Sequence, residues 1–326
     1  MDPSDESPRT PTVARGRRPG VAWTGVGRGL HTRDPSLVGR LRAWAQIMRP
    51  AAAFTHLTSA ELRGWWLPPV PDGCPVWIVQ SGAQNASTRS GVRVIRQRAI
   101  PPSELIDGLR VALPAETIVA CAFDLGLLDL VVIIDGALHA GAVTLDELGA
   151  VARQHRRGAP SLRAALPLAD GRSESPWETL LRLLHVVCGI SVEPQRELRH
   201  NGVFVARADL WLVGTQEIHE YDGDAHLLVA RQRQDLKRAR RLVDAGIVRR
   251  GFTSRDVINQ PLAILREADA AVGREHDPTR IERWYALLRE SLVTAAGTAR
   301  FGARLGIAVP EDGAPSIAER TDGLGA

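Results

Sequence analysis

Acidic residues inside two short apolar runs constrain this 326-residue chain more than any other feature. The first run, 208–213, contains Asp209, and the second begins at Ile218 and contains Glu220. Their apolar residues and the turn residues between them predict two buried strands. A carboxylate in such a strand costs several kcal/mol to desolvate unless a partner compensates for it. We therefore expect Asp209 and Glu220 to share a partner, and a divalent metal ion is the obvious candidate.

The predicted strands 203–213 and 216–221 are antiparallel neighbours, which brings Asp209 toward Glu220. Side chains two residues apart on a strand share a face, so Asp222 points with Glu220 if the strand continues that far. We predict Asp209, Glu220 and Asp222 as catalytic metal ligands, because hard carboxylate oxygens suit Mg²⁺ or Mn²⁺. Such an ion lowers the pKa of a bound water and polarises a phosphoryl oxygen, as phosphodiester hydrolysis requires.

Two further residues are candidates for the same site. His226, four residues after Asp222, is predicted to act as a general base or to assist the leaving group, with a surface-loop histidine as the alternative. Glu178 follows Ser175 and Pro176 at the start of a predicted helix. That spacing is typical of a capping box, so Glu178 has a structural role or a catalytic one at about even odds.

A strongly basic helix is predicted over 230–245. Basic runs of this kind are usually solvated, but beside a metal site they offer a surface for phosphates. The predicted nucleic-acid contacts are Arg231, Arg233, Lys237, Arg238 and Arg241.

The phrases that carry these residues resemble a known family. They are 207–210, the segment 220–226 (Glu-Tyr-Asp-Gly-Asp-Ala-His), 234–238 and 245–250, with Glu178 in the helix before them. Together they are similar to an uncharacterised family related to very short patch repair endonucleases, within the PD-(D/E)XK restriction-endonuclease-like superfamily. The resemblance covers about residues 172–258. It implies a Mg²⁺-dependent DNA nuclease with a mixed sheet flanked by helices, in which Asp209 and Glu220 bind metal and Asp222, His226 and Glu178 complete the site.

One position departs from the superfamily's pattern. Its usual Glu-x-Lys is Glu220-Tyr221-Asp222 here, so the lysine that commonly assists the attacking water is missing. His226 is the expected replacement, as histidine is in the patch-repair relatives.

The preceding region, about 23–168, resembles the part found before this nuclease domain in proteins with AbiEi-type antitoxin domains. Residues 56–64, 108–111 and 135–138 carry the resemblance. It implies a DNA-contacting or regulatory module, tied to phage defence or to a toxin partner.

The expected fold class is α/β. We predict a disordered basic tail over 1–20, a mainly helical α+β recognition or regulatory domain over 21–168, and a restriction-endonuclease-like domain over 169–258. A helical extension with a loose tail is expected over 259–326. The apolar stretch 118–143 contains three aspartates, so it predicts buried helices and no membrane span.

Other features bear on where the protein acts and with what. Three separated cysteines and the absence of a signal sequence favour the cytoplasm. The leading hypothesis is a Mg²⁺-dependent DNA endonuclease acting in phage defence or DNA repair. The alternatives are a non-catalytic, antitoxin-like DNA-binding regulator on a nuclease scaffold, and an interaction module whose acids are merely solvated.

Overall fold

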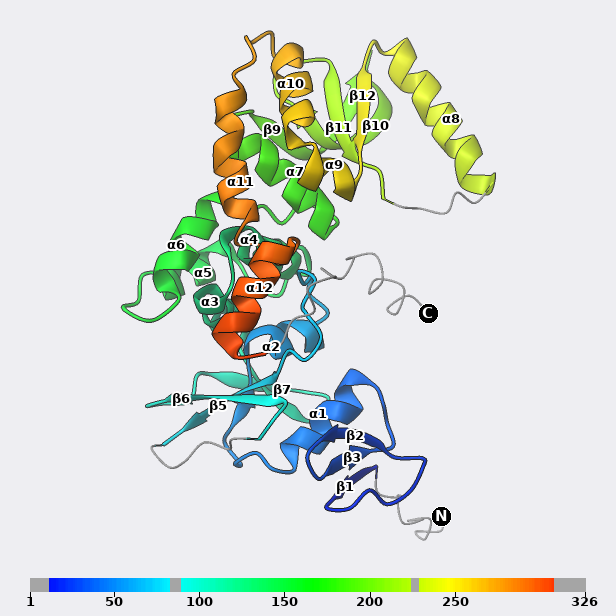
Figure 1. Cartoon of the computed structure of the whole chain (residues 1–326). Coiled ribbons are helices and arrows are strands. Elements are labelled where there is room, and N and C mark those ends of the chain that lie inside the picture. The colour runs from blue at the N-terminus through cyan, green and yellow to red at the C-terminus, as the bar shows by residue number, and fades with distance from the viewer. Residues whose placement is uncertain (1–11, 83–88, 224–228, 308–326) are drawn as a thin grey trace. The chain divides into compact units, whose positions relative to one another are not determined.

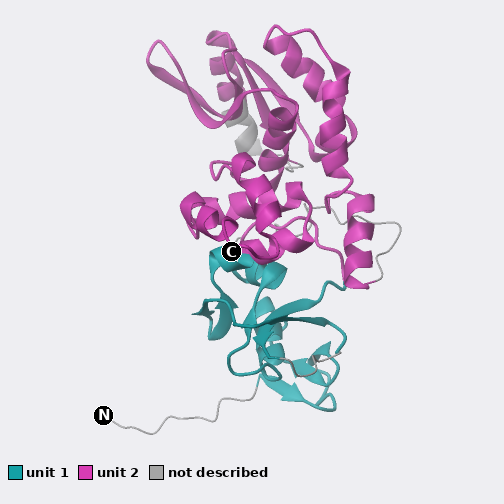
Figure 2. Cartoon of the chain, turned by 90° about the vertical axis from the view of Figure 1, so that its left-hand side faces the viewer, with its two compact units in different colours: residues 1–64, 73–117 teal, residues 65–72, 118–326 magenta. Residues whose placement is uncertain are grey.

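The computed structural model describes residues 12–82, 89–223 and 229–307, and the chain divides into two compact units (Figures 1 and 2). Unit 1 comprises residues 1–64 and 73–117, and unit 2 comprises 65–72 and 118–326. Helices and mixed sheets confirm the α/β class. In the described ranges, no helix combines the length and the apolar character that a bilayer span requires.

Unit 1 contains two sheets. A three-stranded antiparallel sheet has the order β1-β3-β2, and a five-stranded mixed sheet has the order β6-β5-β4-β8-β7. Helix α1 starts where the Ser36 hydroxyl accepts a hydrogen bond from the Gly39 N–H at 3.1 Å. The strands are β1 (Val13–Arg15), β2 (Thr24–Gly27), β3 (Leu30–Thr32), β4 (Ala53–Phe54), β5 (Val76–Ser81), β6 (Val92–Gln97), β7 (Ser103–Ile106) and β8 (Leu109–Ala112), and the helices are α1 (Leu37–Ala45) and α2 (His56–Leu62).

The predicted tail over 1–20 needs a correction. Residues 1–11 lie outside the described part, but Val13–Arg15 form strand β1 and pair with β3. The sequence around this strand is rich in arginine and proline, and three residues are too few to show an alternation of apolar and polar side chains. Its pairing with β3 is what makes it a strand.

Unit 2 is built around a four-stranded sheet of order β12-β11-β10-β9. β9, β10 and β11 form an antiparallel meander, and β12 returns parallel to β11 after helix α8. The predicted antiparallel strands 203–213 and 216–221 and the predicted helix over 230–245 are therefore confirmed, with slightly different bounds. The elements are α3 (Pro114–Asp124), α4 (Leu127–His139), α5 (Leu145–Ala152), α6 (Ala159–Ala165), α7 (Pro176–Val187), β9 (Val192–His200), β10 (Val203–Leu212), β11 (Glu217–Tyr221), α8 (Val229–Asp244), β12 (Val248–Phe252), α9 (Ser254–Asn259), α10 (Pro261–Ala271), α11 (Glu282–Leu288) and α12 (Ala295–Leu305).

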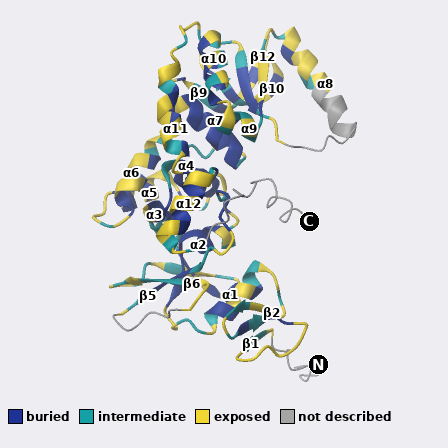
Figure 3. Ribbon diagram, in the orientation of Figure 1, coloured by how far each residue is buried: buried dark blue, intermediate teal, exposed yellow. Residues whose placement is uncertain are grey.

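Helices α7 and α8 cover opposite faces of this sheet. Trp177 of α7 stacks on Tyr221, whereas Arg238 of α8 reaches Glu220. Tyr221 and Glu220 are neighbours on β11 and therefore point to opposite faces. Almost all of α7 is buried, while the described side chains of α8 are mostly exposed (Figure 3).

A buried ion pair joins α4 to α7 within unit 2. Asp135 accepts hydrogen bonds from Arg182 at 2.7 Å and from the Thr179 hydroxyl at 2.9 Å. It also accepts one from the Asp170 main-chain N–H at 2.7 Å. Burial raises the pKa of Asp135 to about 6, although the Arg182 charge opposes the rise. This network ties α4 to the sheet-bearing region. The units divide near residue 117, whereas the expected boundary was at 168.

The C-terminal extension is more ordered than its alanine- and glycine-rich composition predicts. The Thr294 hydroxyl accepts from the Gly297 N–H and starts α12, and Gly306 ends it with φ +68°. Phe301 on this helix is buried. The loose tail expected at the end of the 259–326 extension therefore does not begin before the end of α12 at Leu305, and residues 308–326 lie outside the described part.

Candidate active site

Asp209 and Glu220 lie across from one another on adjacent strands. The register pairs Leu210 with His219 and Trp211 with Ile218, and its continuation places Asp209 opposite Glu220. Paired residues on antiparallel strands share a face of the sheet. The two carboxylates that the sequence singled out are thus on one side of the sheet.

Asp209 is a half-buried acid in a negative environment. Its Oδ2 accepts a hydrogen bond from the Tyr221 main-chain N–H at 3.0 Å. Burial raises the pKa of Asp209 to about 7, and the nearby charges of Glu178 and Glu220 raise it further against the pull of Arg238. Such a carboxyl group accepts a proton or a cation near neutral pH.

Glu178 sits beside Asp209 and also begins helix α7. Its carboxylate accepts hydrogen bonds from the Ser175 hydroxyl at 2.9 Å and from the Glu174 main-chain N–H at 2.8 Å. The Ser175 hydroxyl in turn accepts from the Glu178 N–H at 3.1 Å. Gln195 Nε2 donates to the same carboxylate at 2.9 Å. Both roles considered for Glu178 are therefore compatible with its position.

Gln195 is a site residue that the sequence did not predict. It lies on β9 opposite Asp209 by continuation of the strand register, and its φ of +53° is unusual for a residue other than glycine. No residue pattern in β9 predicts the contact between Gln195 and Glu178.

Glu220 is a buried acid held by two arginines. Arg238 donates to both of its oxygens, through Nη1 at 2.7 Å and through Nη2, and the Nε of Arg249 donates to Oε2. Burial by itself would raise the pKa of Glu220, but the hydrogen bonds and charges of the two guanidinium groups hold it below its usual range. Glu220 is therefore an anion at neutral pH.

Asp222 follows β11 and shares Arg249 with Glu220. A terminal nitrogen of Arg249 donates to Asp222 Oδ1, so the two acids point to the same side as expected. Gly251 lies opposite Glu220 on β12, where a Cβ would overlap the Asp222 carboxylate. The lack of a side chain at Gly251 thus makes room for Asp222, which the sequence did not indicate.

Asp209, Glu220 and Asp222 line an open hollow of about 650 Å³ in unit 2. Of the predicted nucleic-acid contacts, Arg238 and Arg241 line it, and Lys237 is exposed outside it. Arg231 and Arg233 belong to α8, but their side chains lie outside the described part, as does His226 altogether. The lining residues are Phe204, Ala206, Arg207, Asp209, Glu220, Tyr221, Asp222, Arg238, Arg241 and Arg249.

Carboxylate oxygens are the ligands that Mg²⁺ and Mn²⁺ prefer, and the carboxylates of Asp209 and Glu220 lie on the same face of the sheet. Burial, and then the charges of Glu178 and Glu220, raise the pKa of Asp209, and a nearby cation would lower that pKa again. The present arrangement turns Glu220 toward the arginines. Among the described residues, no group of three or more His, Cys, Asp or Glu side chains is already placed to hold one ion. A metal ion at this place would have to displace a guanidinium group from Glu220.

Buried histidines support the opposite face of β11. His185 on α7 and His219 on β11 join through Nε2 and Nδ1 at 2.8 Å, and His219 Nε2 lies 3.2 Å from Glu217 Oε1. His185 Nδ1 faces the Leu181 carbonyl at 2.8 Å, which can only accept. Burial lowers the pKa of His185 to about 3, so His185 is neutral and its Nε2 accepts from His219. This chain fixes the helix carrying Glu178 against the strand carrying Glu220.

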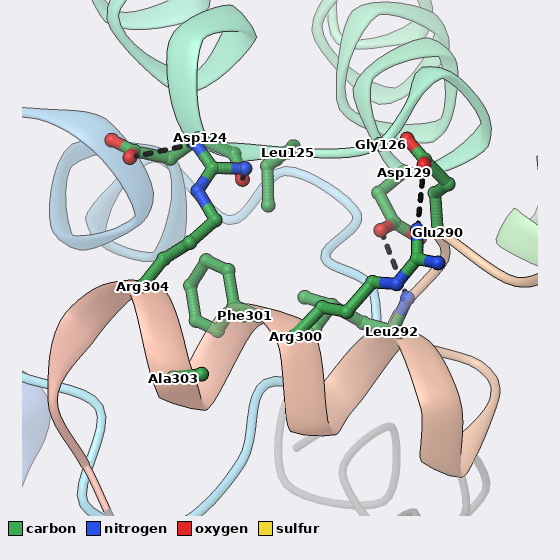
Figure 4. Close-up of a pocket in the computed structure, with 11 residues that line it drawn as sticks. Asp124, Leu125, Gly126, Asp129, Glu290, Leu292, Arg300, Phe301, Ala303 and Arg304 are labelled. Atoms are coloured by element: carbon green, nitrogen blue, oxygen red, sulfur yellow. Dashed lines mark hydrogen bonds and ion pairs between the residues drawn. The ribbon is translucent and has the colours of Figure 1, made fainter.

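A second hollow in unit 2, of about 350 Å³, lies between the α3–α4 turn and α12 (Figure 4). Its arginines are already paired, Arg300 with Glu290 at 2.7 Å and Arg304 with Asp124 at 3.2 Å. Asp129 accepts from the Ser291 hydroxyl and the Leu292 N–H, and burial raises its pKa to about 7. These partners join α4 to the α11–α12 connection, which gives the cluster a structural role.

Comparison with known proteins identifies two relatives. Two uncharacterised proteins of Mycobacterium tuberculosis, from the strains CDC 1551 / Oshkosh and ATCC 25618 / H37Rv, are each 28% identical to this chain over 228 residues. The matches cover 69% of this chain and 81% of each relative. No protein-family model matches the chain, and no solved structure matches it. The relatives' names state no activity, so any function must be argued from the site itself.

Proposed function

We propose that unit 2 is a Mg²⁺-dependent endonuclease that hydrolyses phosphodiester bonds in DNA, in phage defence or DNA repair. The observation that carries the proposal is the pair Asp209 and Glu220, opposite each other on adjacent strands and open to a hollow lined by arginines. The resemblance to the patch-repair nucleases points the same way.

The acids supply the negative side of this chemistry. Asp209 and Glu220 would hold the ion, and Glu178 adds negative charge beside Asp209. A bound Mg²⁺ or Mn²⁺ activates a water and neutralises charge on the phosphoryl group. Asp222 is paired with Arg249 and is more exposed than Asp209 and Glu220.

The arginines supply the positive side. Arg207 and Arg241 are exposed at the hollow, and Arg207 makes one surface ion pair with Glu174. A surface pair of this kind is worth at most about 1 kcal/mol, so a phosphate can displace it. Guanidinium groups bind phosphate oxygens in a bidentate manner. Arg238, within reach of Glu220, provides a cation where the superfamily's lysine is missing.

The test is cleavage by the purified full-length protein. Plasmid and linear DNA are incubated with Mg²⁺, Mn²⁺ or EDTA, using the wild type, Asp209→Asn and Asp244→Asn. Asp244 is exposed at the end of α8, so its variant is a control with the same charge change. We expect metal-dependent cutting by the wild type and the control, and at least a hundredfold loss in Asp209→Asn. Equal cutting by Asp209→Asn, or none by the wild type with any divalent ion, contradicts the proposal.

Glu220 forms ion pairs with both Arg238 and Arg249. This observation favours a second candidate, a non-catalytic DNA-binding regulator of the antitoxin type. In such a protein the arginines keep the acids neutralised, and a toxin is the expected partner. Salt-sensitive DNA binding without cleavage under every divalent ion would select this alternative. None of the three cysteines forms a disulfide, which agrees with action in the cytoplasm in either case.

A further inference from the structure

Three arginines of unit 1 converge on an open hollow of about 650 Å³. Arg15 is at the end of β1, Arg28 lies in the connection between β2 and β3, and Arg89 precedes β6. Gly16 and Gly29 complete the lining. Segments far apart in the sequence thus bring three cations to one place.

The backbone around this hollow is arranged by hydrogen bonds. The Gly16 N–H donates to the Gly29 carbonyl at 3.0 Å, and Arg89 Nη1 donates to the Arg28 carbonyl at 2.9 Å. Gly16 and Gly29 have φ values of +92° and +68°, which disfavour any residue with a side chain. The floor between the arginines therefore stays uncovered.

The guanidinium groups of the hollow lack a counter-charge within the described residues. No carboxylate lines the hollow, and none of the three arginines forms an ion pair there. By contrast, Arg63 in the same unit pairs with Glu104 at 2.7 Å. Converging cations repel one another unless an anion joins them, so the arrangement is complementary to a phosphate.

Unit 1 as a whole also carries an excess of positive charge. Residues 12–64 and 73–117 contain 14 arginines and five acidic residues, although the entire chain has a net charge of only +4. A concentration of one sign of charge attracts extended polyanions. The lining of the hollow consists of arginine and glycine, so it offers no ring to stack on a base and no carboxylate to read one.

We propose that this arginine hollow binds backbone phosphates of a nucleic acid. The side chains of Arg15, Arg28 and Arg89 contact phosphate oxygens and thereby position the strand without reading its sequence. The site is separate from the acidic site of unit 2 and needs no metal, so it stands whether or not unit 2 cleaves DNA.

The test measures binding of the full-length protein to a fluorescent DNA duplex by anisotropy, in EDTA and across a KCl series. The variant is Arg15→Gln, Arg28→Gln, Arg89→Gln, in which the glutamine at 89 can still donate to the Arg28 carbonyl. The matched control removes three exposed arginines of unit 1 outside the hollow: Arg96→Gln, Arg98→Gln, Arg110→Gln.

We expect the hollow variant to bind at least tenfold more weakly near 0.1 M salt and the control to lose less than threefold. Because each lost duplex phosphate contact lowers the slope of log K against log salt by about 0.9, the slope should fall by about 2 to 3 in the hollow variant. Equal losses in both variants would show a diffuse charge effect and overturn the proposal, as would an unchanged slope.

Two further measurements keep the result decisive. A mononucleotide and inorganic phosphate are titrated as competitors, and displacement of the duplex at micromolar concentration would assign the hollow to a free ligand and overturn the nucleic-acid proposal. Circular dichroism and thermal unfolding check the fold. If the triple variant unfolds, the single variant Arg15→Gln replaces it, because the Arg15 guanidinium has no partner among the described residues. This variant should lower the slope of log K against log salt by about 0.9. An unchanged slope would refute the proposal.

Discussion

Arg238 donates from both terminal nitrogens of its guanidinium group to the two carboxylate oxygens of Glu220. This fork-shaped contact joins helix α8 to strand β11 and holds a buried acid as an anion. The same acid is a predicted metal ligand, so arginine and metal compete for it. Phosphate, which attracts the arginines, would shift that competition toward the metal.

The first prediction concerns Arg249, which donates to both Glu220 and Asp222. Arg249→Gln removes a cation that competes with the metal, so we expect Mn²⁺ to bind about tenfold more tightly, equivalent to about 1.4 kcal/mol of coupling. Isothermal titration calorimetry without DNA measures this. Arg199→Gln, which removes an exposed arginine paired with Glu197, is the control. Unchanged or weaker Mn²⁺ affinity in Arg249→Gln argues against competition.

The second prediction is a pH dependence set by Asp209. Its pKa is about 7 in the folded protein against an ordinary value of 3.8. The folded state therefore holds a proton that the unfolded state releases, and stability falls as the pH rises from about 4 to 7 and stays low above that. Asp209→Asn should remove roughly 2 kcal/mol of this fall, a figure that allows for its partial exposure.

Urea unfolding at pH 5 and pH 8 in EDTA checks the effect. Asp129 and Asp135, whose pKa values are also raised, contribute equally to the wild type and the variant. The lowered pKa of Glu220 acts below pH 4.5 and so outside this window. Identical pH dependence of the two proteins would show that Asp209 is not the group responsible.

The third prediction concerns Gly251. A Cβ there would occupy the space of the Asp222 carboxylate, which is the movable end of a side chain near the surface. Gly251→Ala should therefore cost less than about 1 kcal/mol of stability while displacing Asp222 from Arg249. We expect its Mn²⁺ affinity and DNA cleavage to match those of Asp222→Asn. Gly149→Ala, in helix α5, controls for the added methyl group. A Gly251→Ala variant indistinguishable from the wild type would show that the added methyl group does not displace the Asp222 carboxylate.

The fourth prediction concerns Asp135 and Arg182. Asp135→Asn keeps the shape but removes the ion-pair partner of the buried Arg182. Breaking a buried pair from one side typically costs about 3 to 5 kcal/mol. We expect a loss of that size in urea unfolding. The exposed pair Arg199 and Glu197 is the comparison, and Glu197→Gln should cost at most about 1 kcal/mol. A loss below about 1 kcal/mol in Asp135→Asn would mean that water reaches Arg182.

The sequence predicted the sheet of unit 2 because its strands are five to ten residues long and are separated by recognisable turn residues. That pattern also placed Asp209 opposite Glu220, and the Ser175-Pro176 start located Glu178. Strands β4, β7 and β8 have two to four residues, too few for a readable period, and were not predicted.

Long-range relationships were beyond the sequence pattern. Gln195, whose φ is positive, donates to Glu178, and Gly251 matters because a Cβ there would overlap the Asp222 carboxylate. The division of the chain near residue 117 places Asp135 in the same unit as Arg182, its partner 47 residues away. In each case the determining contact forms in three dimensions and leaves no local signature.

The most direct test of the central claim is the stoichiometry of Mn²⁺ binding, measured by calorimetry on the wild type, Asp209→Asn and Glu220→Gln in the presence of a non-cleavable DNA duplex. If the two acids jointly hold a cation, the wild type binds an ion that both variants lose, while Asp244→Asn retains it. Absence of Mn²⁺ binding by the wild type, or binding by either variant equal to that of the wild type, would contradict the account.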